Sequence, residues 1–162
     1  MNKKKFIEKV LEAERTLYNV SKSILINDQD CEDAVQSAIL KAYDKLSALK
    51  EEKYFKTWLV RILINECYKL QRKDIVKLSY EECFEFIKEE EKTDYSDLYI
   101  AIQKLPPRIR VTIVLYYVEG YSIEEIKKIL KIPSGTVKSR LAKGRKLLKT
   151  KLDCMEVHYE QF

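Results

Sequence analysis

The sequence has few of the residues that interrupt helices or build phosphate-binding loops. Its 162 residues include only three glycines and three prolines. A β-sandwich needs turn residues about every 8–12 positions, so their scarcity argues against that class and favours helices. Gly135 and Gly144 do not have the spacing of a GxxxxGK[ST] phosphate loop, and a helical segment rather than a strand precedes them. The composition predicts an all-α chain without a nucleotide loop.

Cysteine and histidine are too scattered to predict a metal site. Cys31, Cys67, Cys83 and Cys154 form no CxxC pair, and the one histidine is His158 near the C-terminal end. Zinc sites need clustered ligands, and no nucleophile stands beside a candidate base, so we expect no metal, cofactor, catalysis or small-molecule substrate. Without a signal peptide or an apolar run of roughly 18 residues, we expect a cytoplasmic protein with reduced thiols.

Charge is distributed unevenly along the chain, which has a formal net charge of +5. Glu81–Asp97 contains eight acidic and two basic residues, whereas Pro133–Lys151 contains seven basic and no acidic ones. Such polarity between segments indicates a connector between two working parts. We therefore expect an N-terminal domain over residues 1–75, an acidic linker over 76–96 and a C-terminal domain over 97–155.

Apolar periodicity predicts three helices before the linker, over residues 4–25, 27–49 and 54–74. Phe6, Val10, Leu17 and Val20 form the apolar stripe of the first. Acidic residues suit a helix N-terminus, so we expect Asp28 and Asp30 to cap the second. The polar surface of the second helix, with one exposed leucine, is compatible either with protein binding or with simple solvation; it carries Asp33, Gln36, Ser37, Leu40, Lys41 and Asp44.

The third predicted helix has a basic face opposite its apolar stripe. The stripe contains Leu59, Leu63, Cys67 and Leu70, helped by Trp58 and Ile62. Cations, an amide and an aromatic ring suit contact with an unpaired nucleic-acid strand, because cations hold phosphate and a ring can stack on a base. The opposite face carries Arg61, Asn65, Tyr68 and Arg72. An ordinary amphipathic helix with a basic exterior fits the same pattern.

After the linker, the sequence predicts a helix-turn-helix. Helices over 97–105 and 107–120 lead to Gly120, and Ser122 with Glu125 forms a possible capping box for the next helix. A break at 131–133 separates that helix from another opened by Ser134. Such a second helix projects its early residues into a major groove, so we expect DNA binding. Its packing face carries Val137, Leu141, Gly144 and Leu148, and its polar side carries Thr136, Lys138, Ser139, Arg140, Lys143 and Lys146.

Two blocks of the sequence, in this order, resemble a bacterial RNA polymerase sigma factor of the sigma-70 family. The first block is "DCEDAVQSAILKAYDKL" followed by "FKTWLVRILINECYKLQRK". The second is "LPPRIRVTIVLYYVEGYSIEEIKKILKIPSGTVKSRLAKGRKLLK". The likeness is to the small extracytoplasmic-function (ECF, group IV) type and covers nearly the whole chain. It implies an all-α fold with a region 2-like bundle and a region 4-like helix-turn-helix. It also implies core RNA polymerase, promoter DNA and an anti-sigma factor as partners.

The resemblance implies roles by position. Asp33, Gln36 and Leu40 would contact the clamp helices of the largest polymerase subunit. Ser37 stands where the family usually has glutamate. The −10 element would meet the loop over residues 47–54 together with Arg61, Asn65, Lys69 and Arg72. The −35 element would meet Thr136, Lys138, Ser139, Arg140, Lys143 and Lys146. A stand-alone helix-turn-helix regulator and a non-catalytic protein-interaction module are the alternative interpretations.

Overall fold

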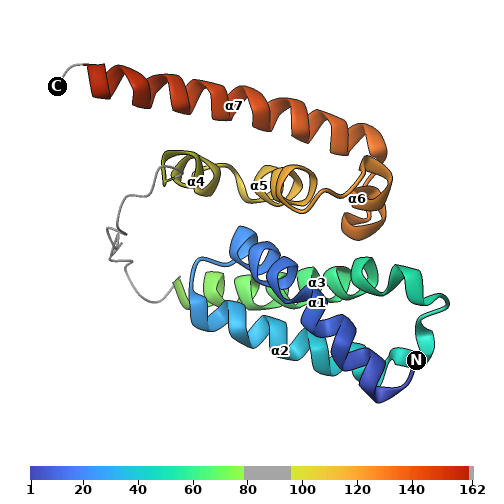
Figure 1. Cartoon of the computed structure of the whole chain (residues 1–162). Coiled ribbons are helices and arrows are strands. Elements are labelled where there is room, and N and C mark those ends of the chain that lie inside the picture. Colours follow the sequence, from blue (N-terminus) through green and yellow to red (C-terminus); the bar gives the residue numbers. More distant parts are fainter. Residues whose placement is uncertain (79–95, 161–162) are drawn as a thin grey trace.

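The computed structural model describes residues 1–78 and 96–160, and the regular structure within those ranges is helical. The expected all-α class is confirmed. One layer contains α1 (Lys3–Ile24), α2 (Asp28–Asp44), the short 3₁₀ helices η1 (Leu46–Ala48) and η2 (Glu52–Tyr54), and α3 (Phe55–Leu78). The other layer contains α4 (Ser96–Gln103), α5 (Pro107–Ile113), the π-helical turn η3 (Val114–Val118), α6 (Ile123–Leu130) and α7 (Ser134–Glu160), with α7 running along its outer side (Figure 1).

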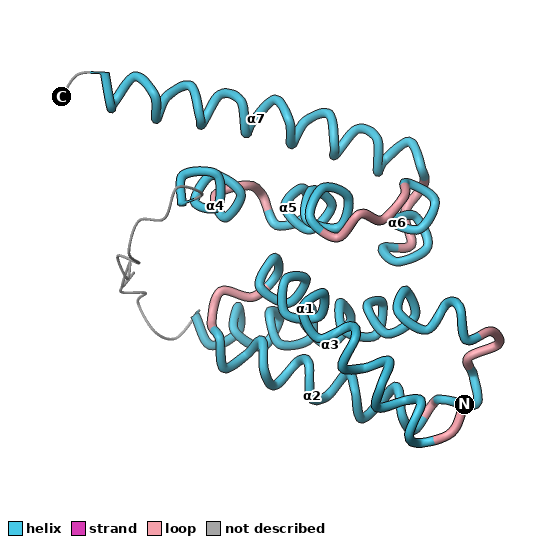
Figure 2. Tube along the Cα trace, viewed as in Figure 1, coloured by secondary structure: helices cyan, strands magenta, loops and turns pink. Residues whose placement is uncertain are grey.

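The connections between the described helices are short (Figure 2). α3 continues to Leu78, past the expected end at residue 74, and α4 begins at Ser96. Residues 79–95, most of the acidic linker, lie outside the described residues, so the domain boundaries stay a prediction. Within the described ranges, no helix combines the length and apolar character needed to cross a membrane.

The N-terminal bundle is set by asparagine caps and a core rich in alanine. Asn2 caps α1 by accepting from the backbone N–H of Lys5 at 2.9 Å. Asn27 caps α2 by accepting from the N–H groups of Gln29 and Asp30 at 2.8 and 3.4 Å. The N-cap residue is therefore Asn27 rather than Asp28 or Asp30, which corrects the capping half of the expectation. Both aspartates lie in the first turn, where their carboxylates complement the helix dipole as expected, whereas Asn27 occupies the cap position from which a side chain reaches the free N–H groups.

Small side chains bring α2 against its neighbours. Ala34, Ala38 and Ala42 repeat every four residues and are fully buried. α3 buries a wider face than its predicted stripe, because Val60 and Ile64 are buried as well. The reason is tertiary: α3 contacts α1 and α2 on one side and α6 of the other layer on another.

Local signals in the second layer fall where the sequence places them. Pro107 occupies the first turn of α5. Gly120 has a φ of 72°, which ends η3 in a left-handed conformation that favours glycine. Ser122 and Glu125 form the complete capping box of α6. Lys131 then takes a φ of 53° and turns the chain into α7, so the helix-turn-helix and its capping box are confirmed.

The two layers are joined by a buried arginine and a common hydrophobic core. Arg110 is 6% exposed and donates through Nε to the backbone oxygen of Ser23 at 2.5 Å and through Nη1 to that of Gln103 at 2.8 Å. One guanidinium thus satisfies carbonyls at the C-terminal ends of α1 and α4. Asn19 adds a second link by donating to Glu119 at 2.8 Å. The buried apolar residues of both layers form a single cluster.

Candidate nucleic-acid interface

α7 presents a buried stripe and a basic outer face, as its sequence predicts. Val137 and Leu141 are buried with Ile126 and Ile129 of α6, which fixes the angle between the two helices. Gly144 is buried in the same stripe. A Cβ built there would lie 2.6 Å from Cδ1 and 2.7 Å from Cγ1 of Ile113, so the glycine permits the close approach of α5 and α7.

The predicted −35 residues lie on the opposite side of α7. Lys138, Ser139, Lys143 and Lys146 are exposed, whereas Thr136 and Arg140 are half-buried. The hydroxyl of Ser139 donates to the backbone oxygen of Thr136 at 3.0 Å and keeps its acceptor capacity free. The face therefore offers four cations in successive turns, together with a hydroxyl near the start of the helix.

The predicted −10 residues on α3 divide into two groups. Asn65, Lys69 and Arg72 are exposed, but Arg61 is half-buried. Tyr68, expected to offer a ring for base stacking, is half-buried and packs against the hydrophobic cluster. Burial raises the pKa of its hydroxyl, and the nearby guanidiniums of Arg140 and Arg108 oppose that shift.

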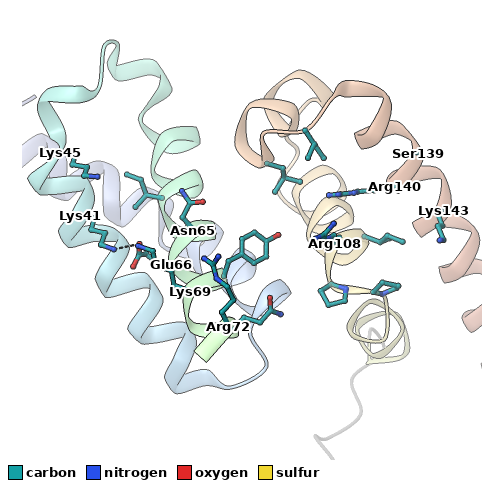
Figure 3. Close-up of a pocket in the computed structure, with 18 residues that line it drawn as sticks. Lys41, Lys45, Asn65, Glu66, Lys69, Arg72, Arg108, Ser139, Arg140 and Lys143 are labelled. Atoms are coloured by element: carbon teal, nitrogen blue, oxygen red, sulfur yellow. Dashed lines mark hydrogen bonds and ion pairs between the residues drawn. The ribbon is translucent and has the colours of Figure 1, made fainter. Parts of the chain in front are cut away.

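A cavity of about 1430 Å³ lies between the two layers, and part of each predicted surface lines it (Figure 3). Asn65, Lys69 and Arg72 line it from α3. Ser139, Arg140 and Lys143 line it from α7. Arg61, Thr136, Lys138 and Lys146 are not among its lining residues, so they lie apart from this meeting of the two walls.

The cavity is strongly basic. Its charged lining comprises seven cations and one carboxylate, namely Lys41, Lys45, Lys69, Arg72, Arg108, Arg140, Lys143 and Glu66. Within the described ranges, Arg72, Arg108, Arg140 and Lys143 form no salt bridge. Opposed cations without counter-charges favour a polyanion as ligand. The described residues contain no cluster of histidine, cysteine and carboxylate groups that could hold a metal.

Sequence reasoning missed the four other charged lining residues: Lys41 of α2, Lys45 at its C-terminal end, Glu66 of α3 and Arg108 of α5. Three of them are ordinary surface cations whose meeting depends on how the layers pack. Glu66 had a visible signal, because it is the sole acidic residue between Phe55 and Arg72.

The predicted polymerase-binding residues lie on α2. Asp33, Gln36 and Leu40 are exposed, and Leu40 retains 67% of its surface. Gln29 donates to the carboxylate of Asp33 at 3.2 Å. Asp33 also lines a second cavity, of about 440 Å³, together with Ser37 and the cationic side chains of Lys41, Lys69, Arg72 and Lys73. Gln36 and Leu40 do not line either cavity.

Comparison with known proteins places both layers in one family. Residues 10–74 match the family described as Sigma-70 region 2, and residues 96–148 match Sigma-70, region 4. The ECF RNA polymerase sigma factor SigW of Bacillus subtilis (strain 168) is 32% identical over 84% of this chain and 82% of its own length. The ECF RNA polymerase sigma-E factor of Escherichia coli (strain K12) is 30% identical over 76% and 74% of the respective lengths.

Solved structures agree. The sigma factor RpoE of Bartonella quintana, crystallised with the anti-sigma factor NepR, has a TM-score of 0.78 and 27% identity over 93% of this chain and 98% of its own. CnrH, solved with the cytosolic domain of CnrY, has a TM-score of 0.69 at 22% identity over 94% and 90% of the respective chains, a likeness of fold. By its two matched regions and these relatives, the chain belongs to the ECF RNA polymerase sigma factors of the sigma-70 family.

Proposed function

We propose that the chain binds core RNA polymerase and directs it to a restricted set of promoters. The observation that carries the proposal is the pairing of a region 2 match with a region 4 match on two layers that each present a basic surface. Promoter selection then comes from reading two DNA elements with one chain.

α7 is suited to the −35 element. Its exposed lysines can position the helix on phosphates, and Lys138 and Ser139 lie near its N-terminal end, from which side chains reach base edges in the major groove. Thr136, Arg140, Lys143 and Lys146 extend the same face. On α3, Asn65 would capture an unpaired base of the −10 element, while Arg61, Lys69 and Arg72 would follow the strand backbone.

The exposed face of α2 is suited to polymerase. Asp33 and Gln36 offer polar contacts beside Leu40, whose large exposed apolar surface would be removed from water on binding. In this proposal residues 1–75 hold polymerase and the −10 element, residues 97–155 read the −35 element, and residues 76–96 connect them.

The closed arrangement of the two layers cannot read a promoter. By their names, the −10 and −35 elements are centred about 25 base pairs apart. At about 3.4 Å per base pair, this separation is on the order of 85 Å along B-form DNA. Asn65 and Lys143 instead line one cavity. The layers must therefore separate when polymerase and promoter bind, and the links through Arg110 and Asn19 must open.

The chain would act in the cytoplasm by binding, without catalysing a reaction. An anti-sigma factor is its proposed negative regulator, by analogy with the similar sigma factor that was crystallised with one. Such a regulator needs the sigma factor in a state that does not bind promoters, and the closed arrangement fits that need.

The test adds the purified chain to core RNA polymerase and maps transcription starts on fragmented genomic DNA. We expect a small set of starts that depend on the chain, and retention of the chain by polymerase. Lys138→Ala with Ser139→Ala should weaken initiation that depends on the −35 element and leave polymerase binding intact. Tight binding to a pseudopalindromic duplex without polymerase, and no dependent start, would favour a stand-alone helix-turn-helix regulator instead.

A further inference from the structure

Glu66 is a buried carboxylate placed between two lysines in the basic wall of α3. Its residue is 8% exposed. Its Oε1 accepts from Lys41 Nζ of α2 at 2.6 Å and from Lys69 Nζ, one turn further along α3, at 3.2 Å. All three residues line both the large cavity and the smaller one, so the cluster forms part of the wall between them (Figure 3).

The cluster keeps its carboxylate charged. Burial raises the pKa of Glu66, but the two ammonium groups outweigh burial and hold that pKa below its ordinary value. The lysines are half-exposed, with side-chain exposures of 42% for Lys41 and 54% for Lys69. An anchored anion thus faces two cations that can still reach solvent.

The ion pair that joins α2 to α3 uses the same Glu66 oxygen that accepts from Lys69. Ser37 lies one turn before Lys41, where an acidic residue would supply a partner within α2. Its hydroxyl supplies no charge, and the partner of Lys41 comes from α3 instead. Lys41 therefore restrains Glu66 from the neighbouring helix, and Glu66 in turn restrains Lys69.

We propose that Glu66 is a positioning residue that orients the ammonium group of Lys69 toward the phosphate backbone of the unpaired promoter strand. The inference rests on the proposed function. A free lysine carries substantial rotamer entropy, which it loses when it grips a phosphate. Because Lys69 is already restrained by Glu66, less of that entropy is lost on binding. Lys41 is the anchor that holds the carboxylate in place.

This role predicts two effects of opposite direction for Glu66→Gln. Removing the carboxylate frees Lys69, so promoter opening should fall by roughly five- to tenfold, the loss expected when about half of a lysine's rotamer entropy must be supplied on binding. The same change adds one net positive charge to the wall. Non-specific affinity for duplex DNA should therefore rise, and the slope of log affinity against log salt should steepen by up to about 0.9. A loss of folded protein would lower both quantities together.

The experiment uses holoenzyme assembled from core RNA polymerase and the chain, on a promoter found by start-site mapping. Permanganate reactivity of −10 thymines measures opening, and salt titration on non-promoter DNA measures non-specific affinity. Asp28→Asn is the matched control, since it removes a more exposed carboxylate, paired with Lys22, elsewhere in the same bundle. It should leave opening within twofold of wild type.

A double-mutant cycle locates the effect. If Glu66 acts through Lys69, Glu66→Gln should have little further effect on opening in a Lys69→Gln background. Equal opening by wild type and Glu66→Gln, or additive losses in the cycle, would overturn the inference. If Glu66→Gln does not fold, Lys41→Gln replaces it, and opening equal to wild type would then overturn the inference. Absence of promoter-dependent opening by the wild-type chain would instead overturn the proposed function.

Discussion

Gly144 allows α5 and α7 to pack closely, and the change in the free energy of unfolding caused by Gly144→Ala tests how tightly they pack. Alanine is favoured over glycine inside a helix by about 1 kcal/mol. Here its Cβ would lie 2.6 and 2.7 Å from two carbons of Ile113 and 3.0 Å from Cγ2 of Ile109. Ile113 is 1% exposed and β-branched, so it has little room to move. Overpacking of this kind costs about 1–3 kcal/mol, which leaves a net destabilisation of up to about 2 kcal/mol.

Gly135 provides the matched control within the same helix. It is exposed, and a Cβ there meets nothing within 4 Å. Gly135→Ala should stabilise the chain by up to about 1 kcal/mol, so the difference between the two variants reports the overpacking cost of about 1–3 kcal/mol. Urea unfolding of the whole chain, followed by circular dichroism, measures both.

Removing the Ile113 side chain should turn the destabilisation caused by Gly144→Ala into a stabilisation. Ile113→Ala alone costs about 2–5 kcal/mol because it empties a core position. In that background Gly144→Ala no longer meets Cγ1 or Cδ1 of Ile113, and only Cγ2 of Ile109 still lies 3.0 Å away, so it should stabilise by up to about 1 kcal/mol. Equal stabilisation by Gly144→Ala and Gly135→Ala in the wild-type chain would show that Ile113 does not crowd position 144, because α5 and α7 would then separate freely.

Three further predictions follow from buried charges and thiols. Arg110→Met should destabilise the chain by about 2–4 kcal/mol in thermal unfolding, because three backbone carbonyls lose a charged donor. The control Arg145→Met loses only an exposed hydrogen bond to a tyrosine, so its stability should stay within about 0.5 kcal/mol of wild type. Burial raises the pKa of the Cys67 thiol to about 12, so thiol reagents at pH 8 should modify the exposed Cys154 long before Cys67. Mass spectrometry measures both rates, and equal rates would contradict the burial of Cys67. The pKa of Glu66 is lower in the folded chain than in the unfolded chain, so the charged carboxylate stabilises the fold fully above about pH 5. That stabilisation is lost as pH falls through the folded-state pKa. In Glu66→Gln the free energy of unfolding should therefore depend less on pH in the acid range.

Local signals in the sequence predicted the helix-turn-helix well. The capping box of Ser122 and Glu125, the glycine stop at Gly120 and the packing position of Gly144 each depend on residues a few positions apart. At the start of α2 the prediction named the wrong cap residue, because Asn27 stands directly before Asp28 and accepts from the free N–H groups itself.

Features that depend on packing between the layers could not be predicted. Nothing local indicates that Arg110 reaches Ser23, that Tyr68 packs inward, or that α3 and α7 line one cavity. The burial of Val60 has the same origin, because α3 has neighbours on more than one side. The site residues could be proposed from spacing and resemblance, but their meeting across a cavity is a property of the folded chain.

The two walls of the cavity carry part of each proposed promoter-reading surface, and we expect the two layers to separate in use. Spin labels at Lys56→Cys on α3 and Ala142→Cys on α7, both exposed positions, measure this directly by pulsed electron paramagnetic resonance after Cys83 and Cys154 are replaced by serine. The free chain should give one short distance. The complex with polymerase and promoter should lengthen it by tens of ångströms, since the two elements are on the order of 85 Å apart at about 3.4 Å per base pair. An unchanged distance in a complex that initiates transcription would contradict the separation of the two layers.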